Sequence, residues 1–292
     1  MDGNYSAENV YLAKDLTITA DIGVQKLEGA GSKTLATAGK SLKQVLDMLL
    51  ASRTLPKITT DPSVSVSCPE AKSYEVGTSV TPTFSATFND GAYQYAPGEN
   101  TGVTVSSWSA TFDDKTINSN SGTFDSIIVT DNYSKRVSVL ANHSAGAAPE
   151  DNLGTIVTDA DELATCQIQA GSKTGYSGYI SGFRYQFYGS KVDPINIVSD
   201  NIRDLSKRTA SKNTLEMPIV EGANQVIIAV PASYTVTKVA DNGAFGTDIL
   251  ENFDVKTVSV AGATAGYETD YKVYVYSPKS ALGANTYTVS LK

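Results

Sequence analysis

The feature that most constrains the fold is a long stretch of strand-like text broken by turn residues. Between about residues 58 and 188, hydrophobic and polar residues alternate in segments such as SVSVSC, TPTFSATF, VTVSSWSATF, KRVSVLAN and YISGFRYQFYG. Pro, Gly, Asn and Asp interrupt these segments at NDG, APGENTG, INSNSG and AGAAPEDNLG. Alternation buries one face of a strand, and short strands separated by turns are typical of sheet folds. The pattern predicts an all-β protein.

Length sets the number of domains. At about 150 residues per domain, 292 residues hold about two domains and a short appendage. Hydrophobic residues make up 41% of the chain, which is enough to bury real cores and excludes wholesale disorder. We expect about seven short strands, rich in Thr, Ser and Val, to form an immunoglobulin-like β-sandwich over residues 57–190.

A second β region is expected at residues 213–292. Its segments QVIIAV and YKVYVY lack polar alternation, so we expect them in the middle of a sheet with both faces covered. Before it, SDNIRDLSKRTA predicts a short helix at 199–210, with Ser199 or Asp200 as its N-cap and Ile202 and Leu205 as its apolar anchors. We therefore predict two tandem immunoglobulin-like β-sandwich domains, joined by a linker at residues 191–212.

Residues 1–56 differ from the rest and predict a hairpin followed by one amphipathic helix. LTITADIG alternates, and GAGSKTLATAGK has the small-residue composition of a loop or hairpin. The helix is expected at 41–53, with Ser41 and Gln44 at capping-box spacing and Pro56 after its end. Apolar residues at i, i+3, i+4, i+7 and i+8 place one hydrophobic face on it: Leu42, Val45, Leu46, Leu49 and Leu50.

This apolar helix face needs a partner surface, because an isolated helix of about three turns is marginal in water. Two partners remain open: the adjacent domain of the same chain, or the same helix in neighbouring subunits or an acceptor protein. We assign the five apolar residues to an oligomer or anchor interface, and three equivalent helices packing together predict a trimer.

Charge and hydropathy exclude two classes of partner. Lys and Arg total 23 against 31 Asp and Glu, and the net charge of −8 is the wrong sign for neutralising nucleic-acid phosphates. No apolar run approaches the length of about 18 residues that a membrane helix requires. The first fifteen residues carry no secretory signal pattern. We expect no nucleic acid, no membrane insertion and no export by that route.

The sequence argues against most enzyme classes, and we assign no catalytic residue and no cofactor. The chain has a single histidine, His143, which we expect at the surface or in a turn, and its neighbour Ser144 points to the opposite face of a strand. The segment AGKS resembles the end of a phosphate-binding loop, but Thr34 stands where that loop requires its first glycine.

An acidic turn is the one candidate for a cation. Asp159, Asp161 and Glu162 in TDADEL offer carboxylates at short spacing, as Ca²⁺ requires. The segment lacks the spacing and the mid-loop glycine of an EF-hand, and we favour a solvated acidic turn and assign no metal site.

Cys68 and Cys166 are the only cysteines. A disulfide between them would close a loop of about a hundred residues, and in the chain-entropy model it would stabilise the folded state by roughly 4–5 kcal/mol. Both lie in strand-like text, SVSVSC and LATCQIQA, where reduced cysteine acts as a small buried hydrophobe. We favour free thiols and leave the bridge open.

Aromatic residues in or near expected loops form a candidate platform for sugars. Tyr93, Tyr95 and Trp108 are assigned to possible glycan contact, and Tyr176 and Tyr179 belong to the same group. Core packing and strand-edge placement is the alternative role for these side chains.

Several segments together resemble a group of structural proteins of tailed-bacteriophage virions found in gut phages. VYLAKDLTITADIG, TAGKSLKQVLDMLLAS and PKITTDPSVSVS resemble its recurring unit of hairpin, amphipathic helix and entry into an immunoglobulin-like domain. SYEVGTSVTPTFSATFNDGAYQYAPGENTGVTVSSWSAT is similar to its most specific central stretch. GYISGFRYQFYGSKVDPINIVSDNIRDLSK, EGANQVIIAVPAS and KTVSVAGATAGYETDYKVYVYSP resemble its later parts, so the resemblance covers about residues 10–292.

The resemblance implies a protein of the virion, made in the host cytoplasm, as a head fibre or decoration or as a tail or baseplate component. Residues 1–56 would attach it to other virion proteins, and the two β domains would project outward. No catalytic residue comes with the resemblance. The alternative function is an adhesin that binds glycans of the host surface or of mucus.

Overall fold

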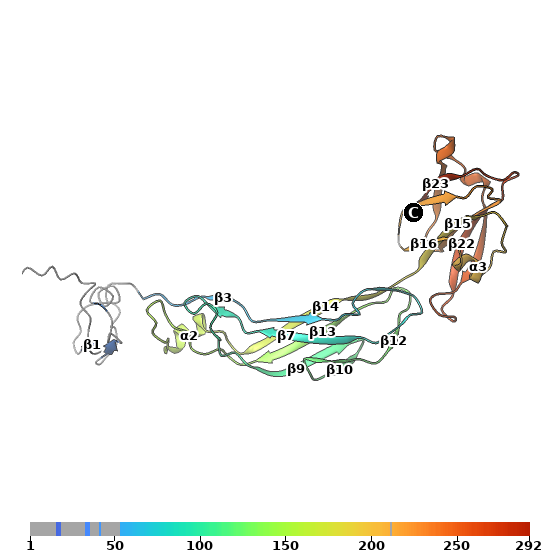
Figure 1. Ribbon diagram of the computed structural model, residues 1–292. Helices are drawn as coiled ribbons and strands as arrows, with labels where there is room; N and C mark the ends of the chain where they lie inside the picture. Colours follow the sequence, from blue (N-terminus) through green and yellow to red (C-terminus); the bar gives the residue numbers. More distant parts are fainter. Residues whose placement is uncertain (1–15, 19–32, 36–40, 42–52, 211) are drawn as a thin grey trace, which may run out of the picture. The chain divides into compact units, whose positions relative to one another are not determined.

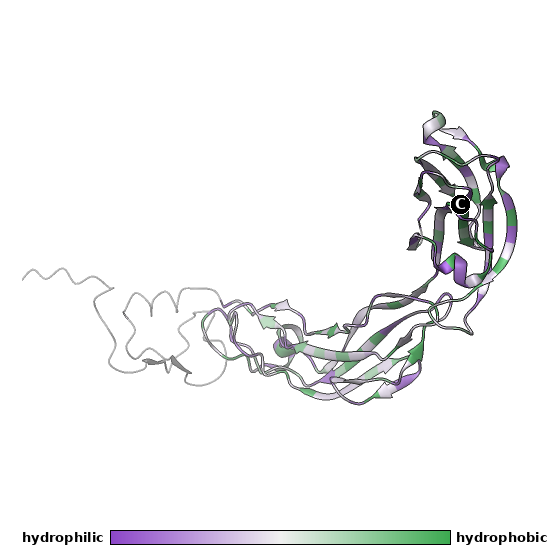
Figure 2. Ribbon diagram, turned by 45° about the vertical axis from the view of Figure 1, so that its right-hand side comes forward, coloured by the Kyte–Doolittle hydropathy of each residue, from purple (hydrophilic) through white to green (hydrophobic). Residues whose placement is uncertain are grey.

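The computed structural model describes residues 16–18, 33–35, 41, 53–210 and 212–292, and Figure 1 follows them along the chain. This part of the protein is all-β, with many strands in several sheets and only short helices. Figure 2 shows hydrophobic and hydrophilic residues alternating along many of the strands, as the sequence pattern predicts. None of the helices in the described ranges is long and apolar enough to cross a membrane.

At the N-terminal end, β1 (Leu16–Ile18) pairs antiparallel with β2 (Lys33–Leu35), and Leu16 lies opposite Leu35. This pair lies within the residues for which the sequence predicts a hairpin. Of the helix expected at 41–53, only Ser41 and Arg53 are described, and Ser41 is buried. The interface residues assigned to that helix lie outside the described residues: Leu42, Val45, Leu46, Leu49 and Leu50.

Residues 57–184, here called the central region, form two larger sheets and two small strand pairs. A five-stranded sheet has the order β10 (Lys115–Ile117), β9 (Val105–Phe112), β13 (Ser134–His143), β14 (Gly171–Phe183) and β5 (Ser73–Glu75), with β5 parallel to β14. A three-stranded sheet has the order β11 (Ser121–Thr123), β7 (Thr83–Asn89) and β4 (Ser63–Ser67). The small pairs are β12 (Ile127–Ile128) with β6 (Ser79–Val80), and β3 (Ile58–Thr60) with β8 (Ala92–Tyr93).

The core of the central region is built from alternating inward residues. Phe84 and Ala86 of β7 are buried, as the alternation in TPTFSATF predicts. The ring of Phe84 packs on Phe124 at 5.3 Å between centroids, and Phe124 packs on Phe112 of β9 at 5.5 Å. Side chains from strands far apart in sequence therefore share this core.

Residues 185–292, here called the C-terminal region, form two larger sheets. The first has the order β16 (Lys207–Ala210), β15 (Tyr185–Lys191), β18 (Gln225–Pro231), β22 (Thr269–Tyr276) and β21 (Asp254–Val260). The second has the order β17 (Thr214–Ile219), β23 (Asn285–Leu291), β19 (Val236–Asp241) and β20 (Thr247–Asp248). The 3₁₀ turns η2 (Asn242–Ala244) and η3 (Leu250–Asn252) flank β20.

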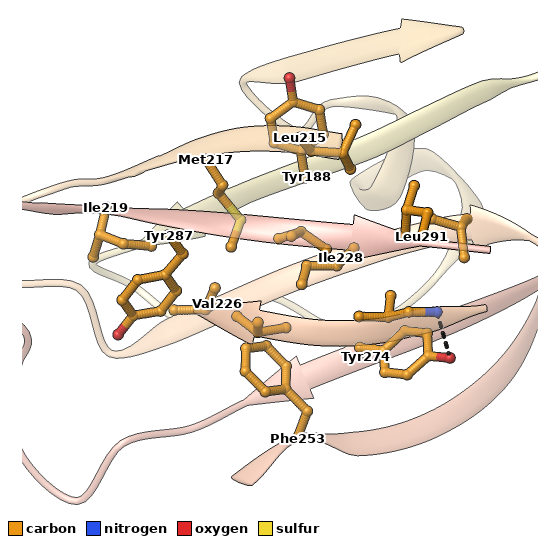
Figure 3. Packing of buried hydrophobic residues seen from close by; sticks show 14 of the residues in the cluster. Tyr188, Leu215, Met217, Ile219, Val226, Ile228, Phe253, Tyr274, Tyr287 and Leu291 are labelled. Atoms are coloured by element: carbon orange, nitrogen blue, oxygen red, sulfur yellow. Dashed lines mark hydrogen bonds between the residues drawn. The ribbon is translucent and has the colours of Figure 1, made fainter. Parts of the chain in front are cut away.

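The two sheets of the C-terminal region share one hydrophobic core, shown in Figure 3. Ile228 and Tyr274 come from the first sheet, and Met217 and Tyr287 come from the second. The Tyr274 hydroxyl accepts a hydrogen bond from the Val236 backbone N–H at 3.2 Å, so this buried phenol is not left unpaired. The two-layer arrangement buries side chains of both sheets between them.

The other face of the first sheet is covered too. Helix α3 (Ser199–Arg203) contributes the buried Ile202, and Leu205 follows it, against Phe187, Ile227 and Tyr271. Every residue of β18 is buried as a result. The prediction that QVIIAV and YKVYVY run through a sheet with both faces covered is confirmed.

Three expectations about local structure are wrong. Residues 191–212 are not a mere linker, because they supply α3 and the edge strand β16 to the C-terminal region. The helix there ends at Arg203, and its N-cap is Val198 without a side-chain hydrogen bond. Cys166 is not in a strand, because it is the last residue of helix α2 (Ala160–Cys166). This helix begins after Asp159, whose side chain caps it by accepting from the backbone N–H groups of Asp161 and Glu162.

The chain forms two compact units whose limits differ from the domain limits expected from the sequence. One compact unit comprises Met1–Val64, Phe88–Ser107 and Ala141–Lys173, and the other comprises Ser65–Thr87, Trp108–Leu140 and Thr174–Lys292. Most limits of these units fall inside strands, whereas the sequence pattern predicts that the first β domain ends at residue 190.

Candidate functional site

The acidic turn forms a helix cap and an ion pair. The carboxylate of Asp159 is occupied by the cap of α2, and Glu162 binds Arg53 in a two-bond contact at 2.6 and 2.8 Å. No group of three His, Cys, Asp or Glu side chains in the part of the chain that the structure describes is arranged to hold a metal ion.

His143 is buried at 6% exposure, so its expected surface or turn position is wrong. It is the last residue of β13, where it continues the inward alternation of Val137, Val139 and Ala141. Its Nδ1 lies 2.9 Å from the Ser144 carbonyl oxygen, and its ring packs against Phe88 at 5.5 Å. The Nε2 atom has no hydrogen-bond partner among the described residues. His143 is a core residue of this region.

Both cysteines are buried and free, which confirms the reading favoured from the sequence. Burial raises the pKa of the Cys68 thiol and of the Cys166 thiol. A thiol held neutral in this way is a poor nucleophile, so neither side chain is a candidate for catalysis.

The aromatic residues assigned to glycan contact do not form one surface. Tyr93 is only 5% exposed, and its hydroxyl accepts from the Ile168 backbone N–H at 3.0 Å and donates to the Ala147 carbonyl at 3.2 Å. Its assignment is wrong, because a buried ring with a satisfied hydroxyl offers no face to a sugar. Tyr95 and Trp108 are partly buried, and their assignment stays a prediction.

A different aromatic group is exposed, and it includes a cation. Tyr176 and Tyr179 of β14 are 52% and 51% exposed, so each presents about half of its surface to solvent. The guanidinium carbon of Arg136 in β13 lies 3.8 Å from the centre of the Tyr176 ring and 5.2 Å from that of Tyr179. We call these three residues the Arg136 cluster.

An irregularity in β14 explains why both tyrosines share an exposed position. In a regular strand, residues three apart point to opposite faces. Here the buried positions shift phase, because Ser177 and Ile180 are both buried. The Ser177 hydroxyl accepts from the Val137 backbone N–H at 3.0 Å and donates to the Gly178 carbonyl at 2.7 Å. A side chain thus replaces a ladder bond, as at a β-bulge, and Tyr176 and Tyr179 are exposed together.

Arg136 differs from most other arginines in having no carboxylate partner within the described ranges. Arg53, Arg184 and Arg203 each lie 2.6–2.9 Å from a carboxylate oxygen. The neighbouring Lys135 lies 3.6 Å from Asp113, so its charge is partly compensated. The Arg136 cluster is therefore a local positive charge between two aromatic rings, on a chain of net charge −8.

A second arrangement fixes the end of residues 1–56, here called the N-terminal module, to the central region. Arg53 Nε lies 2.9 Å from Asp151, whose side chain is 1% exposed, while Glu162 takes the other guanidinium nitrogens. The backbone N–H of Thr54 donates to the Asn152 side chain at 2.8 Å. The Glu162 hydrogen bond is the main cause of a raised pKa for Arg53. This ion pair is buried on the Asp151 side and exposed on the Glu162 side.

Sequence reasoning grouped Tyr176 and Tyr179 with loop aromatics and missed Arg136. The structure places both tyrosines on a strand, next to a strand carrying the arginine. The available signal is the Tyr-Ser-Gly-Tyr spacing, in which a small polar residue and a glycine between two aromatics suit a bulge.

Comparison with protein-family models, with curated proteins and with solved structures finds no match for this chain.

Proposed function

We propose that this chain is a non-enzymatic structural protein of a tailed-phage virion, in which residues 1–56 attach to the particle and two immunoglobulin-like β-sandwich domains are displayed. The resemblance of the sequence to such proteins is the origin of this proposal. In this proposal the protein is a head fibre or decoration, or a tail or baseplate component. The neighbouring copies and virion proteins are its partners.

The observation that carries the proposal is the contact of Arg53 with Asp151. An attachment module transmits force to the displayed region only when its last residues are fixed to that region. Arg53 and Thr54 are held by two carboxylates and one amide of the central region, and one of these carboxylates is almost fully buried. Breaking a buried ion pair leaves an uncompensated charge, so the contact resists separation.

The assignment of the attachment surface rests on the apolar face predicted for residues 41–53. Burying one Leu or Val side chain contributes roughly 1.5–3 kcal/mol, so five such residues would supply the main favourable free energy of an oligomer or anchor contact. Packing of the same face in three copies makes a trimer, and packing on an acceptor protein makes a direct anchor.

The test is incorporation into particles during infection. A chain lacking residues 1–52, and a full-length chain with Leu46→Gln and Leu49→Gln, should be absent from particles purified on a density gradient. The matched control changes the polar face of the same segment, Lys43→Gln and Asp47→Asn, and should be incorporated normally. Circular dichroism of each purified variant checks the β fold. Normal incorporation of the folded deletion variant would contradict the proposal.

Glycan binding is a second candidate function, and the exposed Arg136 cluster favours it. A half-exposed aromatic ring leaves part of its apolar surface in water, and a ligand that covers the ring would bury that surface with a favourable free energy. A glycan array probed with the full chain and with Tyr176→Ala tests this candidate, with Tyr95→Ala testing the surface assigned from the sequence. Binding that is lost in Tyr176→Ala supports the candidate, and an array without binding counts against it.

A further inference from the structure

We propose that the Arg136 cluster binds a carboxylated pyranose, the sugar unit that uronic acids and sialic acids share. The inference rests on the glycan-binding candidate above and adds the class of sugar. The site consists of the Arg136 guanidinium and the exposed rings of Tyr176 and Tyr179.

The guanidinium of Arg136 supplies the recognition of a carboxylate. A guanidinium carries five N–H donors in its plane, and a carboxylate accepts two of them in parallel. The guanidinium carbon lies 3.8 Å from the centre of the Tyr176 ring, and a guanidinium that stacks on a ring keeps its in-plane donors available. No carboxylate of the described residues takes them, in contrast to Arg53, Arg184 and Arg203.

The tyrosines supply the recognition of a sugar ring. A pyranose has an apolar face of C–H groups, which packs on an aromatic ring, and hydroxyl groups around its edge. Tyr176 and Tyr179 are about half exposed on the same side of β14, so two rings flank the cation. A ligand with both a carboxylate and an apolar ring face satisfies the cation and the aromatic surface together.

Hydroxyl groups lie next to this surface. Ser181 follows Tyr179 by two residues on β14, and its hydroxyl oxygen lies 2.8 Å from that of Ser73 in the paired strand β5. Residues two apart on a strand share a face, so these hydroxyls are on the side of Tyr179. One of the two retains a free hydrogen for a sugar hydroxyl, because only one donates within the pair.

Charge favours recognition of one carboxylated sugar unit over recognition of a polyphosphate or nucleic acid. The chain has a net charge of −8, and the one lysine next to Arg136 in sequence already faces Asp113. Binding of a polyphosphate or nucleic acid requires several unpaired cations along one surface. The cluster offers one, which matches one carboxylated sugar within a glycan.

The experiment is a calorimetric titration of the full chain with matched sugars. 3′-Sialyllactose and lactose differ by one carboxylated sugar, and trigalacturonate provides the uronic acid arm. We expect 3′-sialyllactose or trigalacturonate, or both, to bind at least about tenfold more tightly than lactose, and we expect added NaCl to weaken the binding. The arm that binds identifies the source of the carboxylate.

Variants locate the binding. Arg136→Gln should remove the preference for the acidic sugars, and Tyr179→Ala should weaken both acidic sugars by about tenfold. Lys115→Gln, which removes one positive charge from an exposed site in β10, should leave binding unchanged. Arg136→Lys keeps the charge but loses the two-bond geometry, so it should give intermediate binding and serves if Arg136→Gln fails to fold.

Each other outcome has a definite meaning. Equal binding of lactose, 3′-sialyllactose and trigalacturonate that is lost in Tyr179→Ala overturns the carboxylate inference and leaves glycan binding at this site in place. Acidic binding that Arg136→Gln leaves unchanged overturns the assignment to this cluster. Absence of binding to all three sugars overturns the inference, and a glycan array without binding then also removes the candidate function on which it rests.

Discussion

The C-terminal region and the central region are both β structures, yet they are stabilised in different ways. Among the described residues, all of the largest fully buried side chains except Ile180 and Val76 belong to residues 186–292. There, two sheets share one core, and α3 covers a further face. In the central region, several strands have only two or three residues. One described cluster of that region has only Tyr93, Val103 and Ile168 as its buried members.

Polar contacts add to the apolar core of the central region. Besides the Arg53 contacts, Glu70 accepts from Thr83, and Asp90 binds the buried Thr101 through both its carboxylate and its carbonyl. These bonds fix loops that have few apolar residues to bury. The comparison indicates that paired polar groups help to order a region whose strands are short.

The largest effect is expected from a cavity in the C-terminal core. Ile228→Ala removes a fully buried side chain of β18 and should lower the free energy of unfolding of the C-terminal region by about 2–5 kcal/mol. Hydrogen exchange with mass spectrometry reads β18 and β9 separately in the full chain. The exposed Val255→Ala should change stability by less than about 0.5 kcal/mol. Equal loss of protection in both regions would show that they unfold as one.

The central region should depend on its ion pair. Arg53→Ala leaves the buried Asp151 carboxylate with only its backbone donors, and the free energy of unfolding of this region should fall by about 1–3 kcal/mol. Exchange of the amides of Leu153 and Thr155 measures the effect. Arg53→Lys should restore part of the loss, whereas Lys57→Ala, an exposed change nearby, should cost little. If exchange of these two amides were unchanged in Arg53→Ala, the claim that the ion pair stabilises the central region would be wrong.

Alkaline pH should destabilise the C-terminal region through its buried phenols. Burial, with the charge of Asp241, raises the pKa of Tyr287 to about 12. Because the folded state holds this proton more tightly, the contribution is complete below pH 10 and is lost as pH rises through 12. Between pH 7 and pH 11 the wild type should therefore lose about 1 kcal/mol more than Tyr287→Phe, as measured by urea unfolding. Equal losses would place Tyr287 in contact with water.

The smallest effect is expected from acid in the central region. The backbone N–H of Thr83 holds the pKa of Glu70 below its ordinary value. The stability that this bond gives is present above the ordinary carboxyl pKa and is lost as pH falls through the lower, folded value. Glu70→Gln should cost less than about 1 kcal/mol at pH 7 and almost nothing at pH 2. Urea midpoints at the two pH values test it, and an equal cost at both would contradict it.

The sequence predicted the elements in which burial dominates and failed where single polar groups decide. QVIIAV could be placed inside a sheet because every residue is apolar or small, and β18 is fully buried. ATCQIQA has the composition of a strand, but Asp159 caps a helix just before it. His143 was expected outside because of its polarity, although its place in the alternation of β13 puts it inside.

The Arg136 cluster could not be predicted from the sequence, because it depends on which strand lies beside β14 and on the phase shift within β14. The Tyr-Ser-Gly-Tyr spacing is a local signal for the phase shift, but no local pattern encodes the strand pairing. Arg136 and Tyr176 are forty residues apart in the sequence, and the Ser177 hydroxyl accepts from the Val137 N–H across that separation. Pairing between distant strands is fixed by the whole fold.

The most direct test of particle attachment through residues 1–56 is lysine cross-linking with mass spectrometry on intact particles. Lys14, Lys26, Lys40 and Lys43 lie in the N-terminal module, whereas Lys115, Lys256 and Lys279 are exposed on the β regions. We predict that links to other virion proteins come from the N-terminal lysines and that the exposed β-region lysines react without forming such links. Links to virion proteins that are equally frequent from Lys115, Lys256 and Lys279 would contradict attachment through the N-terminal module.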